Sequence, residues 1–281
     1  MRNICFCFLV SFILASCSSE ETAYSYLSRT DAVAEIIDLK LNVTDNNAKF
    51  FYLVQANEMY AIWGNESKDS EYILKNKNLI DEVKPITNIY PQSGDFNVKI
   101  KTLGLKRLDL SKINDTIIAA NEYNSVSELK LTDCKNIKDL RFANQPIASV
   151  DLSGCTTLVT LYCGYPEGVQ TIIGLEKLEK LEDVLINGSL GISDINFTSS
   201  DSLKNVSVSN TDAKEIRLEG LEKLKYIELK NNQLLDAVAL NTLFEALPKV
   251  SGGLYIIVLS GNKGDNGCDK LIATAKGWSF K

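Results

Sequence analysis

Leu140-Arg141-Phe142 and Leu161-Tyr162-Cys163 are two copies of a short pattern that decides the fold of this chain. In each copy, two apolar residues flank one variable residue. Such triplets recur every 10 or 11 residues between residues 105 and 229, and alternate members are mostly 21 residues apart. We therefore expect one structural turn to contain 21 residues. The other triplets are Leu108-Asp109-Leu110, Leu129-Lys130-Leu131, Val150-Asp151-Leu152, Val184-Leu185-Ile186, Ile195-Asn196-Phe197, Val206-Ser207-Val208, Ile216-Arg217-Leu218 and Ile227-Glu228-Leu229.

Each triplet predicts a very short β-strand. In a strand, alternate side chains point to opposite faces, so the two apolar residues share one face and the middle residue lies on the other. A strand of this length is not stable alone, but turns stacked about 4.8 Å apart bury their apolar side chains in one continuous core. The sequence therefore predicts a solenoid of short parallel strands over residues 103–235.

The triplets resemble leucine-rich repeats. Leu129-x-Leu131-x-x-Cys134 and Val150-x-Leu152-x-x-Cys155 match the L-x-L-x-x-N/C core of that family, and the 21-residue turn is similar to its short bacterial form. The resemblance implies that Cys134 and Cys155 occupy the family's ladder position, one turn apart. We expect them to be unpaired core thiols, with a disulfide between them as the alternative.

The period expands once, to 23 residues, between Cys163 and Val184. The sequence there is Tyr165-Pro166-Glu167-Gly168, followed by a charged run that begins at Leu175. We expect a bulged turn and then a helical segment on the convex side.

The period ends after Asn232. Residues 237–247 have apolar side chains at helical spacing with Pro248 behind them, which predicts an amphipathic helix, and residues 254–259 predict a last strand. The ending resembles the C-terminal cap of Bacteroidetes leucine-rich-repeat proteins, so we expect residues 236–281 to cover the last turn of the solenoid.

Residues 35–102 alternate over longer strands and predict a small β-sandwich. The strands are Ile37-x-Leu39-x-Leu41-x-Val43, Phe50 to Val54, Met59 to Trp63 and Phe96-x-Val98-x-Ile100. They resemble a degenerate PKD domain, an immunoglobulin-like module. Trp63-Gly64-Asn65-Glu66-Ser67 stands where that family has W-G-D-G-T, and Asn88-Ile89-Tyr90 opens a match to its last strand. We expect Trp63 in the core, and the sandwich to cap the solenoid without a flexible linker.

Leu14-Ala15-Ser16-Cys17 follows a short apolar run that begins after Arg2. This arrangement resembles a bacterial lipoprotein signal, which implies that residues 1–16 are a signal peptide and that Cys17 is lipidated. The alternatives are an uncleaved anchor helix and a cysteine that stands there by chance. Ser18-Ser19-Glu20-Glu21 is similar to the export tag of Bacteroidetes surface lipoproteins, so we expect residues 17–34 to tether the body to the outer membrane, exposed at the cell surface.

Composition excludes several function classes. Without residues 1–16 the chain has 29 Lys and Arg against 36 Asp and Glu, a formal charge of 29 − 36 = −7, so nucleic acid is not an expected partner. The chain contains no histidine, which removes Ser-His and Cys-His nucleophile pairs. We expect no metal, no cofactor and no catalytic residues, hence no enzyme; a carboxylate pair is the remaining catalytic alternative.

The middle residues of the triplets are the candidate binding surface, because they can vary without disturbing the core. One register contains Arg141, Tyr162, Leu185, Ser207 and Glu228, and the other contains Asp109, Lys130, Asp151, Asn196 and Arg217. Mixed charge with few aromatic residues favours a protein ligand over a sugar. We therefore expect a surface adhesion or binding module with Arg141, Tyr162, Ser207 and Glu228 as candidate contacts. The alternative is a glycan-binding accessory, or a carboxylate-based hydrolase, of a polysaccharide-uptake system.

Overall fold

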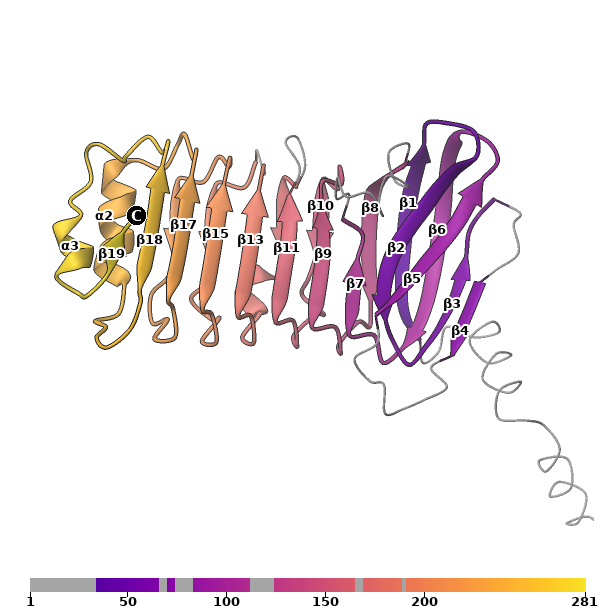
Figure 1. Cartoon of the computed structure of the whole chain (residues 1–281), viewed down its shortest axis with the longest axis horizontal. Helices are drawn as coiled ribbons and strands as arrows, with labels where there is room; N and C mark the ends of the chain where they lie inside the picture. Colours follow the sequence, from indigo (N-terminus) through magenta and orange to yellow (C-terminus); the bar gives the residue numbers. More distant parts are fainter. Residues whose placement is uncertain (1–33, 66–69, 74–82, 112–123, 165–168, 189–190) are drawn as a thin grey trace, which may run out of the picture.

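The computed structural model describes residues 34–65, 70–73, 83–111, 124–164, 169–188 and 191–281. The protein is β-rich, with 44% strand and 8% helix, and its sheets are partly parallel, which confirms the expected β class. The molecule is elongated, with two layered sheets at one end and a row of parallel strands that leads to short helices at the other (Figure 1). The predicted signal peptide, Cys17 and all of the tether except Ala34 lie outside the described residues.

One layer of the N-terminal end is a five-stranded antiparallel sheet. Its strand order is β4 (Ser70–Ile73), β3 (Glu58–Ile62), β6 (Gly94–Leu103), β1 (Glu35–Val43) and β8 (Asn124–Thr132). Strand β1 alternates between buried and half-buried residues, as its sequence predicts. Trp63 is fully buried, as expected, and its carbonyl accepts a hydrogen bond of 3.0 Å from the Tyr90 hydroxyl.

The second sheet has ten strands and runs the whole length of the molecule (Figure 1). In order these are β5 (Lys84–Tyr90), β2 (Ala48–Gln55), β7 (Arg107–Asp109), β9 (Asp139–Ala143), β11 (Thr160–Gly164), β13 (Asp183–Asn187), β15 (Asn205–Ser209), β17 (Tyr226–Lys230), β18 (Ile256–Ser260) and β19 (Ser279–Phe280). All pairs from β7 onward are parallel. We call the part from β7 to β19 the strand stack.

The register of the strand stack explains the sequence period. Leu140 pairs with Leu161, which pairs with Val184, and the line continues through Val206 and Ile227. All five side chains are buried. Two further parallel sheets have two strands each: β10 (Ser149–Asp151) with β12 (Thr171–Ile173), and β14 (Asp194–Asn196) with β16 (Glu215–Arg217). Strands β10, β14 and β16 contain the intervening apolar residues Val150, Ile195 and Ile216. The periodic apolar residues therefore form one extended core.

Asparagine residues occupy several of the described turns that follow strands of the stack. Asn144, Asn210 and Asn231 adopt the left-handed conformation there, with φ of 59°, 55° and 55°. The buried Asn232 side chain accepts hydrogen bonds from Thr211 and donates to the carbonyl of Val208 at 3.0 Å. Since a buried polar group without a partner is costly, these bonds stabilise the turns between strands.

The layered sheets join the strand stack without an intervening loop. Strand β2 pairs with β5 on one side and with β7 on the other, all antiparallel, so the same sheet passes from one region into the next. Glu35, which is 5% exposed, accepts hydrogen bonds from the backbone N–H of Leu105 at 2.6 Å and from the Asn136 amide at 3.0 Å. This carboxylate ties β1 to the start of the stack.

The triplet Leu129-Lys130-Leu131 does not pair as its sequence pattern predicts. We expected this triplet to be a strand of the solenoid, but it lies in β8 and hydrogen-bonds antiparallel to β1, with Leu39 opposite Leu129. In the parallel sheet, β7 pairs directly with β9. Strand β8 lies in contact with β10 but does not form a strand pair with it. The physical reason is that β1 offers a second hydrogen-bonding edge, which a triplet pattern cannot distinguish from the edge of a neighbouring turn.

The expanded step before Val184 contains β12 and then a single 3-10 turn, η2 (Leu175–Lys177). The expected helical segment is thus only one turn long. The expected bulge at residues 165–168 lies outside the described residues.

The C-terminal helix is confirmed as α2 (Ala237–Ala246), with the Asp236 side chain as its N-cap. The strand expected over residues 254–259 is present as β18. It is not the last strand, because α3 (Leu271–Thr274) and the additional strand β19 follow it. The rings of Phe280 in β19 and Phe244 in α2 lie 5.5 Å apart. The half-buried Phe280 ring packs against the buried Phe244 ring, and this contact joins β19 to α2 at the end of the stack.

Candidate functional site

The outward face of the strand stack, which we call the strand face, carries side chains in three rows. Strands of five residues present positions one, three and five outward, because alternate residues share a face. The central row is Asp109, Arg141, Tyr162, Leu185, Ser207, Glu228 and Val258. One flanking row is Arg107, Asp139, Thr160, Asp183, Asn205, Tyr226 and Ile256, and the other is Ala143, Gly164, Asn187, Ser209, Lys230 and Ser260.

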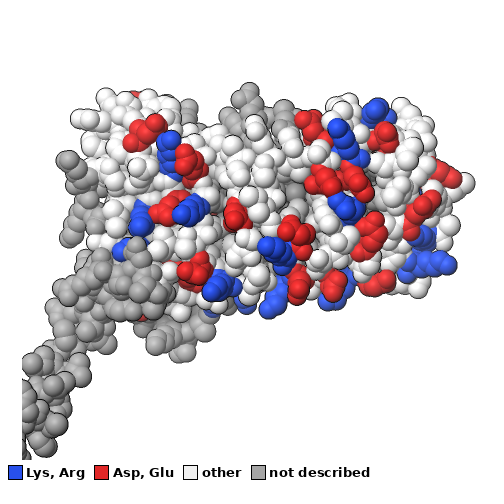
Figure 2. Space-filling model, turned by 180° about the vertical axis from the view of Figure 1, so that it is seen from behind, with Lys and Arg blue, Asp and Glu red and all other residues white. Residues whose placement is uncertain are grey.

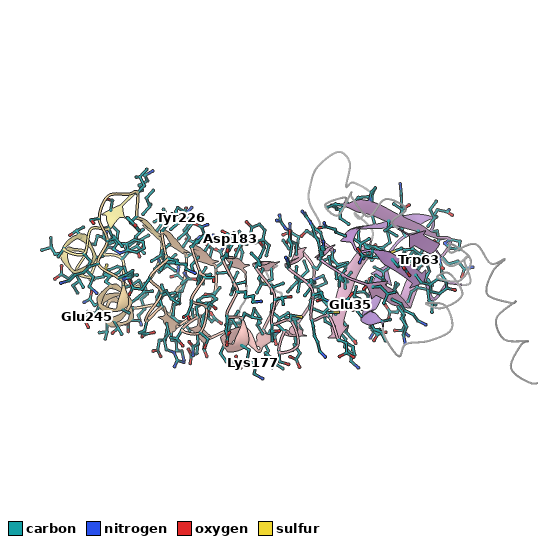
Figure 3. The ribbon with its side chains drawn as sticks, turned by 90° about the horizontal axis from the view of Figure 1, so that it is seen from below. Glu35, Trp63, Lys177, Asp183, Tyr226 and Glu245 are labelled. Atoms are coloured by element: carbon teal, nitrogen blue, oxygen red, sulfur yellow. The ribbon has the colours of Figure 1, made fainter. Side chains whose placement is uncertain are left out.

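Figure 3 shows the two sides of the stack. Asp183 and Tyr226, from the first flanking row, lie on one long side, whereas Lys177 of η2 and Glu245 of α2 lie on the opposite side. Residues on the opposite side can therefore serve as controls for any role of the strand face.

The structure brings the predicted contacts Arg141, Tyr162, Ser207 and Glu228 together in the central row, and all four are half-buried. The second predicted register is not a single surface. Asp109 pairs with Arg141 in the central row, Lys130 lies on β8, and Asp151, Asn196 and Arg217 lie on the separate two-stranded sheets.

The triplet pattern does not predict the two flanking rows of the strand face. Three-residue triplets show one outward residue per strand, whereas five-residue strands add a second and a third. The signal was present, because polar residues stand two positions before the middle residue, as Asp139 stands before Arg141 and Asp183 before Leu185.

A cluster of alternating charges lies at the start of the strand face. The Arg107 guanidinium is 3.0 Å from the Asp109 carboxylate and 3.5 Å from that of Asp139. Arg141 donates to Asp139 at 2.8 and 3.1 Å. Burial acts to lower the pKa of Arg141, but the hydrogen bonds and charge of Asp139 raise it, so the guanidinium is held charged. The cluster is internally neutral and fixes the position of Arg141.

Tyr162 is the central feature of the face. The Arg141 guanidinium lies 4.5 Å from the centre of its ring, a cation–π contact that orients the ring. Leu185 is its neighbour on the next strand, and Gly164, two residues along β11, places no side chain beside it. Tyr162 and Leu185 therefore form a small apolar area between polar groups.

A second polar cluster lies toward the other end of the face. The Tyr226 hydroxyl donates to Glu228 at 2.8 Å, and Lys230 forms an ion pair with the same carboxylate. The hydrogen bond from Lys230 is the main cause that lowers the pKa of Glu228, and desolvation opposes it. Burial, and then the bond to Glu228, raises the pKa of Tyr226. At neutral pH this cluster consists of a neutral phenol, a carboxylate and an ammonium group.

Among the described residues, no group of three or more His, Cys, Asp or Glu side chains could hold a metal ion. Cys134, Cys155 and Cys163 are buried free thiols, and Cys268 is a half-buried one. The Cys134 Sγ lies 3.8 Å from the carbonyl oxygen of Ile36 in β1. Cys134, Cys155 and Cys163 pack inside the protein and do not reach the strand face.

In the described part of the chain, no helix is long and apolar enough to cross a membrane. Comparison of the chain with protein-family models, with curated proteins and with solved structures gave no match.

Proposed function

We propose that this protein is a lipid-anchored binding or adhesion module of the cell surface, in which the strand face engages a protein partner. One observation supports the proposal: seven strands in register place a continuous row of chemically varied side chains on one side of the molecule, and all of them except the buried Asp109 are half-buried. The apolar core behind that row is formed by other residues, so the exposed members of the row can vary without disturbing the core.

The finer architecture and location are part of this proposal. The resemblance of the triplets supports a leucine-rich-repeat solenoid, and that of residues 35–102 supports a PKD-like sandwich. The Leu14-Ala15-Ser16-Cys17 pattern supports lipidation at Cys17 and anchoring in the outer membrane. A tether of 18 residues, 17–34, would then present the strand face at a distance from the lipid surface.

Tyr162 and Leu185 are the centre of the proposed contact. Interface hot spots are enriched in aromatic residues and arginine, and they lie in apolar areas with a polar rim. Arg141 stacks on Tyr162, so the ring is ordered before a partner arrives and loses less conformational entropy on binding. The charged clusters on either side supply the polar rim.

A protein partner fits these contacts better than a glycan. Sugars bind to open aromatic faces, but one face of the Tyr162 ring is occupied by Arg141. The other tyrosine of the face, Tyr226, already donates its hydroxyl to Glu228. The pattern of opposite charges along the central row is instead typical of complementary protein surfaces.

The test is a binding array of extracellular proteins and glycans probed with the full chain purified in detergent. For the protein ligand that binds, Tyr162→Ala and Leu185→Asp should each weaken the affinity by about 10- to 100-fold, the range of a hot-spot residue. Lys177→Ala and Glu245→Ala, on the opposite side of the stack, should leave it unchanged.

Equal losses for the variants on both sides would contradict the role of the strand face. Binding to glycans alone would favour the accessory function. Turnover of any substrate by the purified chain would contradict a function without catalysis.

A further inference from the structure

Strand β5 ends the ten-stranded sheet on the side opposite to β19 (Figure 1). Within the described residues it pairs on one side only, with β2. The side chains of Pro85, Thr87 and Ile89 are exposed along it, and that of Ile89 is 56% exposed. An open strand edge of this kind is a site at which a further strand can pair. We call the outer side of residues 85–89 the β5 edge.

Hydrogen bonds in the neighbouring strands determine which backbone groups point to the β5 edge. Successive residues of a strand direct their N–H and C=O groups alternately to its two sides. The carbonyl of Lys106, directly before β7, accepts a hydrogen bond from the N–H of Asp139 in β9. Three residues farther on, Asp109 therefore directs its groups the other way, to β2, where it lies opposite Leu53.

The register then fixes the direction of the backbone groups in β5. Since Leu53 faces β7, its neighbour Tyr52 faces β5, where it pairs with Ile86. The residues that alternate with Ile86 are the exposed ones named above, and they direct their backbone groups outward.

Two observations agree with this assignment. Pro85 has no N–H and needs none at an open edge. The Ile89 carbonyl accepts a hydrogen bond of 3.2 Å from the Asn65 amide, which does not belong to β2. Among the described residues, no hydrogen bond reaches the N–H or C=O of Thr87 or the N–H of Ile89. Because a carbonyl oxygen has two lone pairs, Thr87 and Ile89 can each still donate and accept one bond, between Pro85 and Pro91.

We propose that the β5 edge pairs with the same strand of a second copy of this chain. The two strands run antiparallel about a two-fold axis that passes beside Asn88. Thr87 then lies opposite Ile89 of the partner subunit, and Ile89 lies opposite the partner's Thr87. Each of these pairs exchanges both of its possible hydrogen bonds. The interface closes the β5 edge of both copies, so assembly through it stops at a dimer.

The prolines and Asn65 select this register. If the axis passed through Thr87, the Pro85 ring of one copy would lie against the Ile89 carbonyl of the other, which an Asn65 amide already contacts. With the axis beside Asn88, the prolines lie outside the hydrogen-bonded pairs.

The side chains of the β5 edge favour a second copy as the occupant. The two Ile89 side chains lie diagonally across the pair on the same face, within reach of each other, so each loses exposed apolar surface. Pro85, Thr87 and Ile89 carry no charge, whereas Figure 2 shows acidic and basic side chains interspersed over the back of the molecule. Two copies of this acidic chain can therefore pair without like charges opposite each other in the hydrogen-bonded pairs.

The experiment is sedimentation velocity of the full chain in density-matched detergent at about 1–300 µM, a range that brackets the weak affinity of a small interface. We expect a reversible equilibrium between monomer and dimer. Thr87→Pro removes an N–H that faces outward and none that faces β2. It should weaken association about tenfold or more, because each copy loses one hydrogen bond to the other.

Ile89→Lys should weaken association to a similar extent, because it places two like charges across the pair. The matched control is Ile173→Lys in β12, where the isoleucine is 49% exposed, and it should leave the equilibrium unchanged. Unchanged urea unfolding of each variant shows that the fold is retained.

Cross-linking tests the register. Thr87 and the partner's Thr87 are diagonal neighbours, about 7–8 Å apart. A short bismaleimide should therefore join Thr87→Cys chains into a dimer in a Cys268→Ser background. Lys177→Cys, on the strand stack, should stay monomeric under the same conditions.

Four results would overturn the proposal: a monomer over the whole concentration range, a dimer that survives both Thr87→Pro and Ile89→Lys, an equal loss with Ile173→Lys, or equal cross-linking of both cysteine variants. A chain that stays monomeric but pairs with a strand of another protein falls under the first result. Tyr162→Ala should leave the dimer intact, so failure here is distinguishable from failure of the strand face.

Discussion

At the scale of single residues, the buried thiols give a measurable consequence of packing. Burial raises the pKa of Cys134 to about 12, of Cys155 to about 11 and of Cys163 to about 12, from an ordinary value of 9.0. In the native protein at pH 8, iodoacetamide should therefore label Cys268 and spare these three, as read by peptide mass spectrometry. Equal labelling of all four would contradict the described core.

The same thiols make stability depend on alkaline pH. The unfolded chain ionises them near 9.0, whereas the folded protein keeps them neutral up to about 11 or 12. Their contribution to the free energy of unfolding is thus complete below pH 9 and is lost as pH rises through the folded pKa values.

Glu35 provides a second prediction at this scale, because it joins β1 to the start of the strand stack. Glu35→Ala removes the acceptor for the Leu105 N–H and the Asn136 amide, and it should lower the free energy of unfolding by about 1–3 kcal/mol. Urea unfolding measures the change, with the exposed Asp45→Ala as control. A loss no larger than that of the control would show that the carboxylate does not hold the junction.

At the scale of elements, Gly164 tests the close pairing of β11 with β13. Its φ is 134°, and a Cβ there would collide with the backbone carbonyl of Asn187. Gly164→Ala should therefore destabilise the protein by about 1–3 kcal/mol. Gly154→Ala is the matched control, since a Cβ at Gly154 meets nothing within 4 Å. Thermal unfolding of both variants compares them, and similar melting temperatures would contradict the described pairing.

The pairing of the strands shows how much of the fold the sequence predicts. The line from Leu140 to Ile227 follows from the period alone, because each strand buries the same two positions against its neighbours. The period does not predict the partner of β8, because Leu129 and Leu131 can pair with the edge of β1 as well as with a strand of the neighbouring turn. Strand β19 has only two residues, too few for any pattern.

The candidate site was predictable to the same extent. The central row contains every predicted contact, because the middle residue of a triplet must face away from the core. The flanking residues Asp139 and Tyr226 depend on strand length, which is fixed by hydrogen bonds between turns rather than by apolar pattern.

At the scale of the whole molecule, the proposed anchor predicts a defined amino terminus. After expression in a bacterium with lipoprotein processing, mass spectrometry should find Cys17 as the first residue, modified by acyl chains, and the protein in the membrane fraction. Cys17→Ser should abolish both the acyl modification and the new amino terminus, because the thiol that carries the first acyl group is absent. An unmodified terminus that begins before Cys17 would contradict the lipoprotein assignment.

The central claim is that consecutive strands stack in register along one sheet, and a distance between labels tests it most directly. Thr160 and Ser279 lie in one row, separated by five strand steps, so spin labels at Thr160→Cys and Ser279→Cys in a Cys268→Ser background should be about 24 Å apart. Pulsed electron paramagnetic resonance measures this distance in the full chain. A narrow distribution near that value is the predicted result, and a broad one, or a centre beyond about 35 Å, would contradict the stack.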